Sequence, residues 1–462
     1  MVKAIVGSGG KTTLIKQYAQ EYLDQGMRVF VTTSTHMFIE ENTLVSDDAD
    51  EIIRELERMH YVMAGRKDGQ KICALSQETY EQVCRRADVV LIEADGSKQL
   101  PIKFPAEQEP VIYENVDEII VVCGLFAINK KAKEVCHRLE LVKQCLQIDD
   151  DTFITAEHIQ KLVMKGYVEP LRARYPEKKI TIRPNHDQSL YQRAAASMIQ
   201  AEMDVSLLKE EWFRPQPKMV ICGGGHVSRE LVKMASCLDF SVKVMDEREE
   251  FANRERFVTA QEVICDSFEN LEQYLEPNAF YVIVTRGHKG DYQCVRTILS
   301  HSYQYLGMIG SRQKVRETFE KLQKDGFSEE QIQTIHAPIG LAIGAVTPAE
   351  IAVSILAEII QEKNRTHAAS ASRELLGLTE HGMLCIIIEK HGSSPRGVGS
   401  MMFVDESKTV DSIGGGAVEL AAIEEARACH KAMIKEYQLN HKDSEKLGMI
   451  CGGSNKVLFL PV

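Results

Sequence analysis

Short apolar runs and helix-type patterns follow one another along the first two hundred residues of the chain. Short apolar strands separated by helical segments are typical of a parallel sheet that is covered by helices on both faces. We expect strands at residues 2–6, 27–33, 88–95, 117–125 and 178–185, and helices from about 13 to 25 and from the last strand to about 203.

The same alternation starts again near residue 218. A long helix closes this second region at 347–364, because Pro348 lies in its first turn and apolar residues recur at helical spacing. The pattern therefore predicts a second α/β unit, with strands at 218–222, 241–247, 262–266, 280–287 and 305–311 and a first helix at 228–238.

The last region combines apolar strands, loops rich in glycine and one helical pattern. Its strands are expected at 384–389, 401–406 and 456–462, and its helix at 419–437. Two polar stretches, 205–217 and 363–375, are expected to be flexible linkers. The chain is thus predicted to fold as three α/β domains, at residues 1–205, 215–364 and 372–462.

Composition excludes several classes of protein. A chain of 462 residues is long enough for two to four domains, and its net charge of −12 argues against a general binder of nucleic acid or of anionic membranes. The twelve cysteines contain no C-x-x-C pair and the fourteen histidines show no zinc spacing, so we expect reduced thiols and no structural zinc. The longest apolar run, 119–128, is too short to span a bilayer, and no signal peptide fits, which favours a cytoplasmic location.

The segment 5–13, IVGSGGKTT, predicts a phosphate-binding loop between the first strand and the first helix. Glycines allow successive backbone N–H groups to converge on an anion, and a lysine adds a positive charge over the terminal phosphates. Ile5 stands where the longer form of the motif has its first glycine. The candidate nucleotide-binding residues are Gly7, Gly9, Gly10, Lys11, Thr12 and Thr13.

Glu93 and Asp95 end the apolar strand 88–95. A carboxylate at such a strand end beside a phosphate loop commonly holds a magnesium ion and its water shell, to which the Thr12 hydroxyl could add. Thr12, Glu93 and Asp95 are therefore the candidate Mg²⁺ residues, although a solvated strand end would give the same pattern. The choice between ATP and GTP stays open.

A second glycine loop, CGGGHVS, follows the strand 218–222 and opens the next helix. It resembles the dinucleotide fingerprint with serine in place of the third glycine, and an acid at the end of the next strand would accept hydrogen bonds from ribose hydroxyls. His226 faces the ligand or only begins the helix. The candidate cofactor-binding residues here are Gly223, Gly225, His226, Ser228 and Asp246.

Further candidates follow other strands and loops. Arg286 and Ser311 come at strand ends where doubly wound sheets bind ligands, and both suit an anion. His288, three residues from Asp291, suits acid–base chemistry or a surface hydrogen bond. Arg396 suits an anion. Cys451 is flanked by glycine and is the cysteine we expect to be accessible, although a packed core thiol is an equal alternative.

Several of these motifs together resemble the XdhC/CoxI family. GGGHVS, V-x-D-x-R-x-E-F, TRGH…D, GMIGSRQK and TPAEIAVSILAEII resemble its Rossmann domain, and GSSPRGVGSMM, IGGGAVE and GMICGG resemble its small domain. The resemblance covers residues 215–462. It implies a maturation factor that binds the molybdenum cofactor, oversees its sulfuration and delivers it to the apoenzyme of a molybdenum hydroxylase, with a cysteine desulfurase or a selenium donor as a further partner.

Two features depart from that family. The small domain follows the Rossmann domain here instead of preceding it, and Ala417 stands where the family loop often has cysteine. Residues 1–205, with GSGGKTT, TTSTH and LIEADGSK, resemble the YqeC-type accessory protein of selenium-dependent molybdenum hydroxylases. The chain is thus predicted to join a P-loop-type domain, a Rossmann-like domain and a small C-terminal α/β domain.

The expected function is maturation of molybdenum hydroxylases, with ATP or GTP, Mg²⁺ and the molybdenum cofactor as ligands. Cys451, with Arg396 as an anion contact, is expected to meet the cofactor or its transferable sulfur or selenium, since a thiolate can carry such an atom. Two alternatives stay open: an oxidoreductase that uses NAD(P), for which His288 is the candidate base, and a P-loop kinase or NTPase switch. NTPase activity and homodimerisation are also left open.

Overall fold

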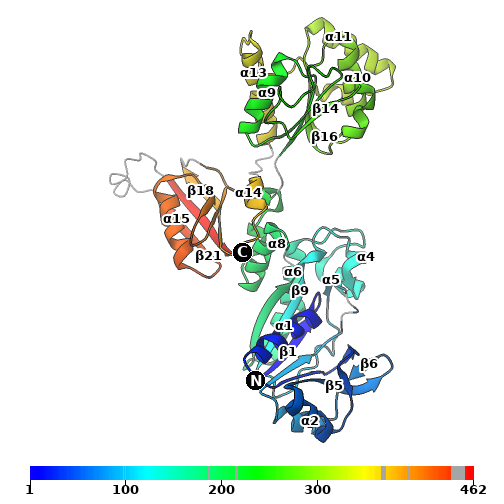
Figure 1. Ribbon diagram of the computed structural model, residues 1–462, viewed down its shortest axis with the longest axis vertical. Coiled ribbons are helices and arrows are strands. Elements are labelled where there is room, and N and C mark those ends of the chain that lie inside the picture. The colour runs from blue at the N-terminus through cyan, green and yellow to red at the C-terminus, as the bar shows by residue number, and fades with distance from the viewer. Residues whose placement is uncertain are drawn as a thin grey trace. The chain divides into compact units, whose positions relative to one another are not determined.

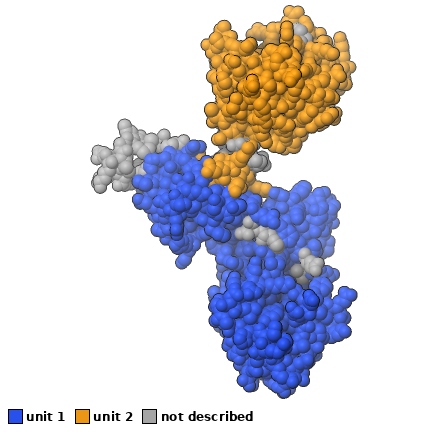
Figure 2. Space-filling view, viewed as in Figure 1, with its two compact units in different colours: residues 1–209, 378–396, 401–462 blue, residues 210–377, 397–400 orange. Residues whose placement is uncertain are grey.

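The computed structural model describes residues 1–96, 98, 100–185, 188–213, 217–365, 371–392, 396–438 and 453–462. They form two compact units (Figure 2). Unit 1 contains residues 1–209, 378–396 and 401–462, and unit 2 contains residues 210–377 and 397–400. Among the described residues, no helix combines the length and the apolar character that crossing a membrane requires.

The first part of unit 1 is built on a nine-stranded sheet whose order is β11-β9-β1-β7-β2-β5-β6-β3, with β4 paired to β5 (Figure 1). The first strand, β1, lies between β7 and β9 and is parallel to both. Only β3 and β6 pair in antiparallel fashion among the strands described. The strands are β1 (Val2–Gly7), β2 (Val29–Thr33), β3 (His36–Phe38), β4 (Thr43–Val45), β5 (Tyr61–Asp68), β6 (Lys71–Cys73), β7 (Val89–Glu93), β9 (Glu118–Gly124) and β11 (Lys179–Asn185).

Helices and a two-stranded ribbon complete this part. The ribbon pairs β8 (Ile102–Lys103) with β10 (Cys136–His137). The α-helices are α1 (Lys11–Asp24), α2 (Ala49–Met59), α3 (Gln77–Cys84), α4 (Ala132–Val135), α5 (Leu139–Leu146), α6 (Ala156–Val163), α7 (Glu169–Arg174) and α8 (Leu190–Gln200). A 3₁₀ turn, η1 (Leu125–Ala127), and a π-helical turn, η2 (Met164–Val168), lie between them.

The second part of unit 1 is a five-stranded antiparallel sheet with one helix, α15 (Gly416–Ala428). The prediction of a helix over 419–437 is wrong beyond Ala428. Residues 433–438 alternate between half-buried and exposed positions and pair with β22, so they form a strand. The order is β20-β19-β18-β22-β21, and the strands are β18 (Met383–Gly392), β19 (Met401–Val404), β20 (Thr409–Asp411), β21 (Met433–Gln438) and β22 (Gly453–Pro461).

Unit 2 is a doubly wound parallel sheet in the order β14-β13-β12-β15-β16-β17. Its central strands are buried on both faces, which explains their unbroken apolar sequences. The strands are β12 (Lys218–Cys222), β13 (Ser241–Asp246), β14 (Glu262–Cys265), β15 (Ala279–Ile283), β16 (Tyr303–Met308) and β17 (Ile335–His336). The helices are α9 (His226–Cys237), α10 (His288–Leu299), α11 (Arg312–Lys324), α12 (Glu329–Gln333), α13 (Pro348–Arg365) and α14 (Arg373–Leu376), with η5 at Phe268–Tyr274.

These sheets confirm the predicted fold class: two parallel α/β sheets and a small sheet domain with a helix. The three domain boundaries remain a prediction. The stretch 205–217 is not the open polar linker that we expected, because short 3₁₀ turns η3 (Val205–Leu207) and η4 (Glu210–Phe213) bury Trp212 and Phe213. The Trp212 carbonyl accepts a hydrogen bond from Ala371 N–H, within unit 2.

Candidate nucleotide and cofactor sites

The loop between β1 and α1 requires glycine at two positions. Gly7 has φ +91°, and a Cβ atom there would lie 2.1 Å from the carbonyl oxygen of Val122 on β9. Gly9 has φ +85°, and its Cβ would lie 2.5 Å from the Cα of Gly124. Other residues would clash with the neighbouring strand, so the glycines let the loop wrap closely around the end of β9.

Lys11, the first residue of α1, is buried beneath this loop with only 3% of its side chain exposed. Its ammonium donates a hydrogen bond to the Gly7 carbonyl at 2.7 Å. The same Nζ lies 2.9 Å from Asp95 Oδ1 and 3.9 Å from Glu93 Oε1. The loop, the lysine and both carboxylates predicted from the sequence therefore converge in one place.

Asp95 is fully buried and supports the loop from below. Its Oδ2 accepts hydrogen bonds from Gly7 N–H and from the Tyr167 hydroxyl, both at 2.9 Å, and lies 3.0 Å from Lys103 Nζ. Tyr167 comes from the π-helical turn η2, a geometry that is frequent at functional sites. Sequence reasoning missed Tyr167 and Lys103, which lie far from the motif along the chain and carry no local signal.

Lys103 continues an ion-pair chain away from the loop. Its fully buried ammonium pairs with Glu109 at 2.8 Å, and Arg138 forms a bidentate pair with the same carboxylate, with distances of 2.6 Å. Burial alone would raise the pKa of Glu109, but hydrogen bonds from Arg138 and Lys103 outweigh it and lower that pKa to about 2. Burial and the neighbouring cations Arg138 and Lys103 also lower the pKa of His137.

Glu93 differs from Asp95 in having an unused oxygen. Its Oε2 is buried and has no hydrogen-bond partner within the part of the chain that the structure describes. Burial raises the pKa of Glu93 to about 7, with the Asp95 charge adding to the rise and Lys11 and the Thr12 hydroxyl opposing it. Thr12 is half-buried and Thr13 is exposed.

Glu93 and Thr12 thus suit a Mg²⁺ ion that arrives with a nucleotide, since hard oxygen ligands and a lone carboxylate oxygen match its preference. Asp95 is already engaged by other donors. Among the residues described, no three His, Cys, Asp or Glu side chains form a preformed metal cluster. Substrate phosphates would have to supply the remaining ligands.

The glycine loop of unit 2 lies between β12 and α9. Gly223 has φ +110°, and a Cβ there would lie 2.4 Å from the Val284 carbonyl. Gly225 is the N-cap of α9 and His226, its first residue, is exposed. Ser228 is fully buried and donates a hydrogen bond to the Gly223 carbonyl at 2.5 Å, so this serine braces the loop.

Asp246 ends β13 as predicted, but its carboxylate is occupied by the protein. It accepts hydrogen bonds from Gly224 N–H at 2.7 Å and from Arg248, whose Nε and Nη2 lie 2.9 and 3.0 Å away. Burial opposes its ionisation, yet these bonds outweigh that effect and lower the pKa of Asp246. A ribose diol would reach this carboxylate only by displacing Arg248.

The ends of β15 and β16 carry the next candidates. Arg286 is exposed, and Ser311 caps α11 by accepting a hydrogen bond from Lys314 N–H at 3.3 Å. His288 begins α10, but its side chain is outside the described part. Asp291 is fully buried and contacts Thr285 and Lys314 instead of forming a surface pair.

In the small sheet, Arg396 is exposed and its Cγ would lie 3.4 Å from a Cβ at Gly414. Glu419 orders the adjoining loop, because it accepts hydrogen bonds from the N–H groups of Ile413 and Gly415, both at 3.0 Å. Cys451 lies outside the described residues. The loop it belongs to therefore stays a prediction.

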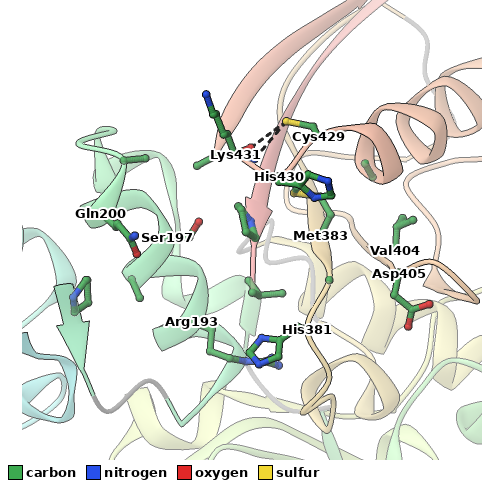
Figure 3. A pocket seen from close by; sticks show the side chains of 18 of the residues that line it. Arg193, Ser197, Gln200, His381, Met383, Val404, Asp405, Cys429, His430 and Lys431 are labelled. Carbon is green, nitrogen blue, oxygen red and sulfur yellow. Dashed lines mark hydrogen bonds between the residues drawn. The ribbon is translucent and has the colours of Figure 1, made fainter. Parts of the chain in front are cut away.

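Accessible thiols are not confined to Cys451. Cys237 and Cys265 are exposed, and Cys429 is half-buried. Cys429 borders a cavity of about 1230 Å³ in unit 1, where the Lys431 N–H points to its sulfur at 3.5 Å (Figure 3). Arg193, also at this cavity, donates hydrogen bonds to the carbonyls of Leu378 and Glu380 and so ties α8 to the start of the small sheet.

Comparison with known protein families gives three matches along the chain. Residues 3–140 match the model of the YqeC protein, residues 219–359 that of the XdhC Rossmann domain, and residues 377–438 that of the XdhC and CoxI family. The matched segments follow one another in the order predicted from the sequence motifs. The resemblances inferred from those motifs are confirmed.

Three similar proteins have partial matches. The chain is 36% identical over 152 residues to the uncharacterized protein YqeB of Escherichia coli, covering 32% of this chain and 28% of that protein. It is 29% identical over 155 residues to a probable xanthine dehydrogenase subunit of Bacillus subtilis, covering 33% and 45%. It is 34% identical over 146 residues to the uncharacterized protein YqeC of Escherichia coli, covering 30% and 57%. The chain therefore spans less than two thirds of the length of each.

Proposed function

Because this chain joins a segment of the YqeC family to segments of the XdhC and CoxI families, we propose that it is an accessory factor for the maturation of molybdenum hydroxylases. The family pairing favours a selenium-dependent hydroxylase as the partner. In this proposal the protein binds a nucleotide in unit 1 and the molybdenum cofactor in unit 2, and it assists sulfuration or selenation of the cofactor or its insertion.

One observation carries the proposal. The chain contains two glycine loops, each at a junction between a central parallel strand and a helix, at β1–α1 and at β12–α9. This is the position at which α/β sheets bind phosphate-bearing ligands. The molybdenum cofactor is a phosphate-bearing pterin, so a factor that handles it under nucleotide control would need both loops.

In unit 1 the N–H groups of the loop would bind the phosphates, and Lys11 would leave Asp95 to contact them. Mg²⁺, held by Thr12 and Glu93 together with the nucleotide, would neutralise phosphate charge. The buried oxygen of Glu93 that lacks a partner among the described residues supports this assignment. Whether the nucleotide is hydrolysed would decide between a switch and a carrier.

In unit 2 the ligand would lie at the carboxyl ends of β12, β15 and β16, near Gly225, Arg286 and Ser311. Cys451 would meet the cofactor or its transferable sulfur or selenium, with Arg396 as an anion contact. A thiolate in a loop next to a cation has the reactivity that such a role requires.

The proposal is tested in cells that make a molybdenum hydroxylase but lack this protein. The hydroxylase should contain little cofactor or an inactive form, and the intact chain should restore its activity. Lys11→Ala should restore it poorly, whereas Lys16→Ala, an exposed lysine on the same helix, should restore it fully. A hydroxylase that is fully active without the protein would contradict the maturation role.

A second measurement identifies the ligands directly. The protein is purified from cells supplied with molybdate, denatured, and the released small molecules are identified by mass spectrometry. A pterin in the released fraction supports the proposal. A nicotinamide dinucleotide in its place would favour the oxidoreductase alternative.

A further inference from the structure

Three strand ends of unit 2 are joined by a buried chain of polar contacts. Next to the glycine loop, a Cβ at Gly223 would lie 2.9 Å from the Cα of Thr285, so β12 and β15 meet closely here. The hydroxyl and the N–H of Thr285 both donate to Asp291 Oδ1, at 2.6 and 3.1 Å. Asp291 Oδ2 pairs with the ammonium of Lys314, which follows β16. The contacts thus run from the glycine loop to the first turn of α11.

The two charges of this pair differ in exposure. The Asp291 side chain is fully buried, whereas 14% of the Lys314 side chain is exposed. A ligand at the carboxyl edge of the sheet could therefore reach the lysine and not the aspartate. Burying such a pair costs desolvation energy that a merely structural contact does not readily repay.

The surroundings of Lys314 are rich in cations. The two segments that form this edge, TRGHKGD at 285–291 and GSRQK at 310–314, contain four lysine or arginine residues and one acid, Asp291. Arg286, Lys289 and Arg312 are all exposed. This density of positive charge contrasts with the net charge of −12 of the chain and favours an anionic ligand.

We propose that Lys314, positioned by Asp291, binds a phosphoryl group of the ligand of unit 2, at a subsite separate from the glycine loop. The inference rests on the proposed function and names the group that the cofactor unit recognises. Since β12, β15 and β16 are neighbours in the sheet, the subsite lies roughly 10 Å from the loop, two strand spacings away. The ligand would thus extend across the sheet edge with its phosphoryl group at Lys314.

The test uses the full chain and the fluorescent oxidised pterin prepared from the molybdenum cofactor of a purified hydroxylase, with and without its phosphate. Fluorescence titration should show that the intact protein binds the phosphorylated pterin at least ten times more tightly. Lys314→Gln should lose about ten- to a hundredfold of the affinity for the phosphorylated form and none for the other. Lys324→Gln, an exposed lysine on the same helix, should behave like the intact protein.

A second variant separates binding from folding. Lys314→Gln leaves Asp291 without its cation, so the double variant Asp291→Asn/Lys314→Gln removes both charges and should unfold at nearly the same temperature as the intact protein. It should still lack the preference for phosphate. Full retention of that preference in either variant would overturn the proposal and assign the phosphate to the glycine loop. An intact protein that binds both pterins equally would also overturn it, and one that binds neither would contradict the proposed function itself.

Discussion

The ammonium of Lys11 lies 2.9 Å from Asp95 Oδ1, while Lys103 lies 3.0 Å from the other oxygen of the same carboxylate. Asp95 is therefore shared between two buried lysines. When phosphates arrive, Lys11 can leave without stranding the aspartate, because Lys103 still balances its charge. This arrangement assigns Asp95 to the positioning of the loop and leaves Glu93 for the metal.

Removing the charge of Lys11 should weaken nucleotide binding. A charge-assisted phosphate contact contributes roughly 1.5–3 kcal/mol, so Lys11→Ala should lower the affinity for ATP or GTP about ten- to a hundredfold. Titration calorimetry measures this, with Lys16→Ala as the matched control. Equal affinity in the intact protein and Lys11→Ala would remove the phosphate loop from the nucleotide site.

Neutralising Asp95 should destabilise the fold more than a surface substitution does. Asp95→Asn leaves the buried ammonium groups of Lys11 and Lys103 without their shared counter-charge, and a broken buried ion pair costs about 3–5 kcal/mol. Urea unfolding measures the loss. The exposed Asp24, on the same helix as Lys11, provides the control Asp24→Asn, which should change stability by about 0.5 kcal/mol or less. A similarly small change for Asp95→Asn would mean that the network is dispensable.

Binding of the magnesium nucleotide should depend on pH near neutrality. Burial raises the pKa of Glu93 to about 7, so the group is protonated below that pH and cannot hold a cation, and it becomes a carboxylate above it. The dependence of nucleotide affinity on Mg²⁺ should therefore strengthen from pH 6 to pH 8. Glu93→Gln should flatten this change and leave only the titration of the nucleotide itself, as followed by calorimetry at several pH values.

Glu109 should stabilise the protein in a different pH range. Its pKa is lowered to about 2, below the ordinary value of 4.5, so its contribution is fully present above pH 4.5 and is lost as the pH falls towards 2. Glu109→Gln should cost roughly 1–3 kcal/mol at pH 7, and the difference from the intact protein should shrink at pH 3. Denaturant unfolding at the two pH values tests this. A difference that stays constant with pH would contradict the ion-pair assignment.

The motifs predicted the fold where local signals were strong. Glycine–lysine and glycine–glycine loops behind apolar strands identified β1–α1 and β12–α9, and the unbroken apolar runs identified the central parallel strands. The helix over 419–437 was wrong because helix-compatible residues continue past Ala428, while pairing with β22 decides the structure of 433–438. Pairing over a long sequence distance leaves no mark in a local window.

The candidate sites show the same limit. Lys11 and the two carboxylates could be named from spacing alone, but Tyr167 lies 72 residues from Asp95 and joins it only through the folded π-helical turn. Asp246 was placed correctly at the end of β13, yet no local pattern indicated that Arg248 would occupy it. Side-chain partners that satisfy a buried charge are decided by packing, which a motif does not encode.

The order of strands in the small sheet has a consequence for biosynthesis. β22 pairs with β18 on one side and β21 on the other, although it follows both in the chain. While a ribosome is still adding the residues before Gly453, the two inner edges face water with unpaired N–H and C=O groups, which invites pairing with another nascent chain. A chaperone bound at this stage would protect the gap, and a message truncated before Gly453 would yield an aggregating product instead of a shortened domain.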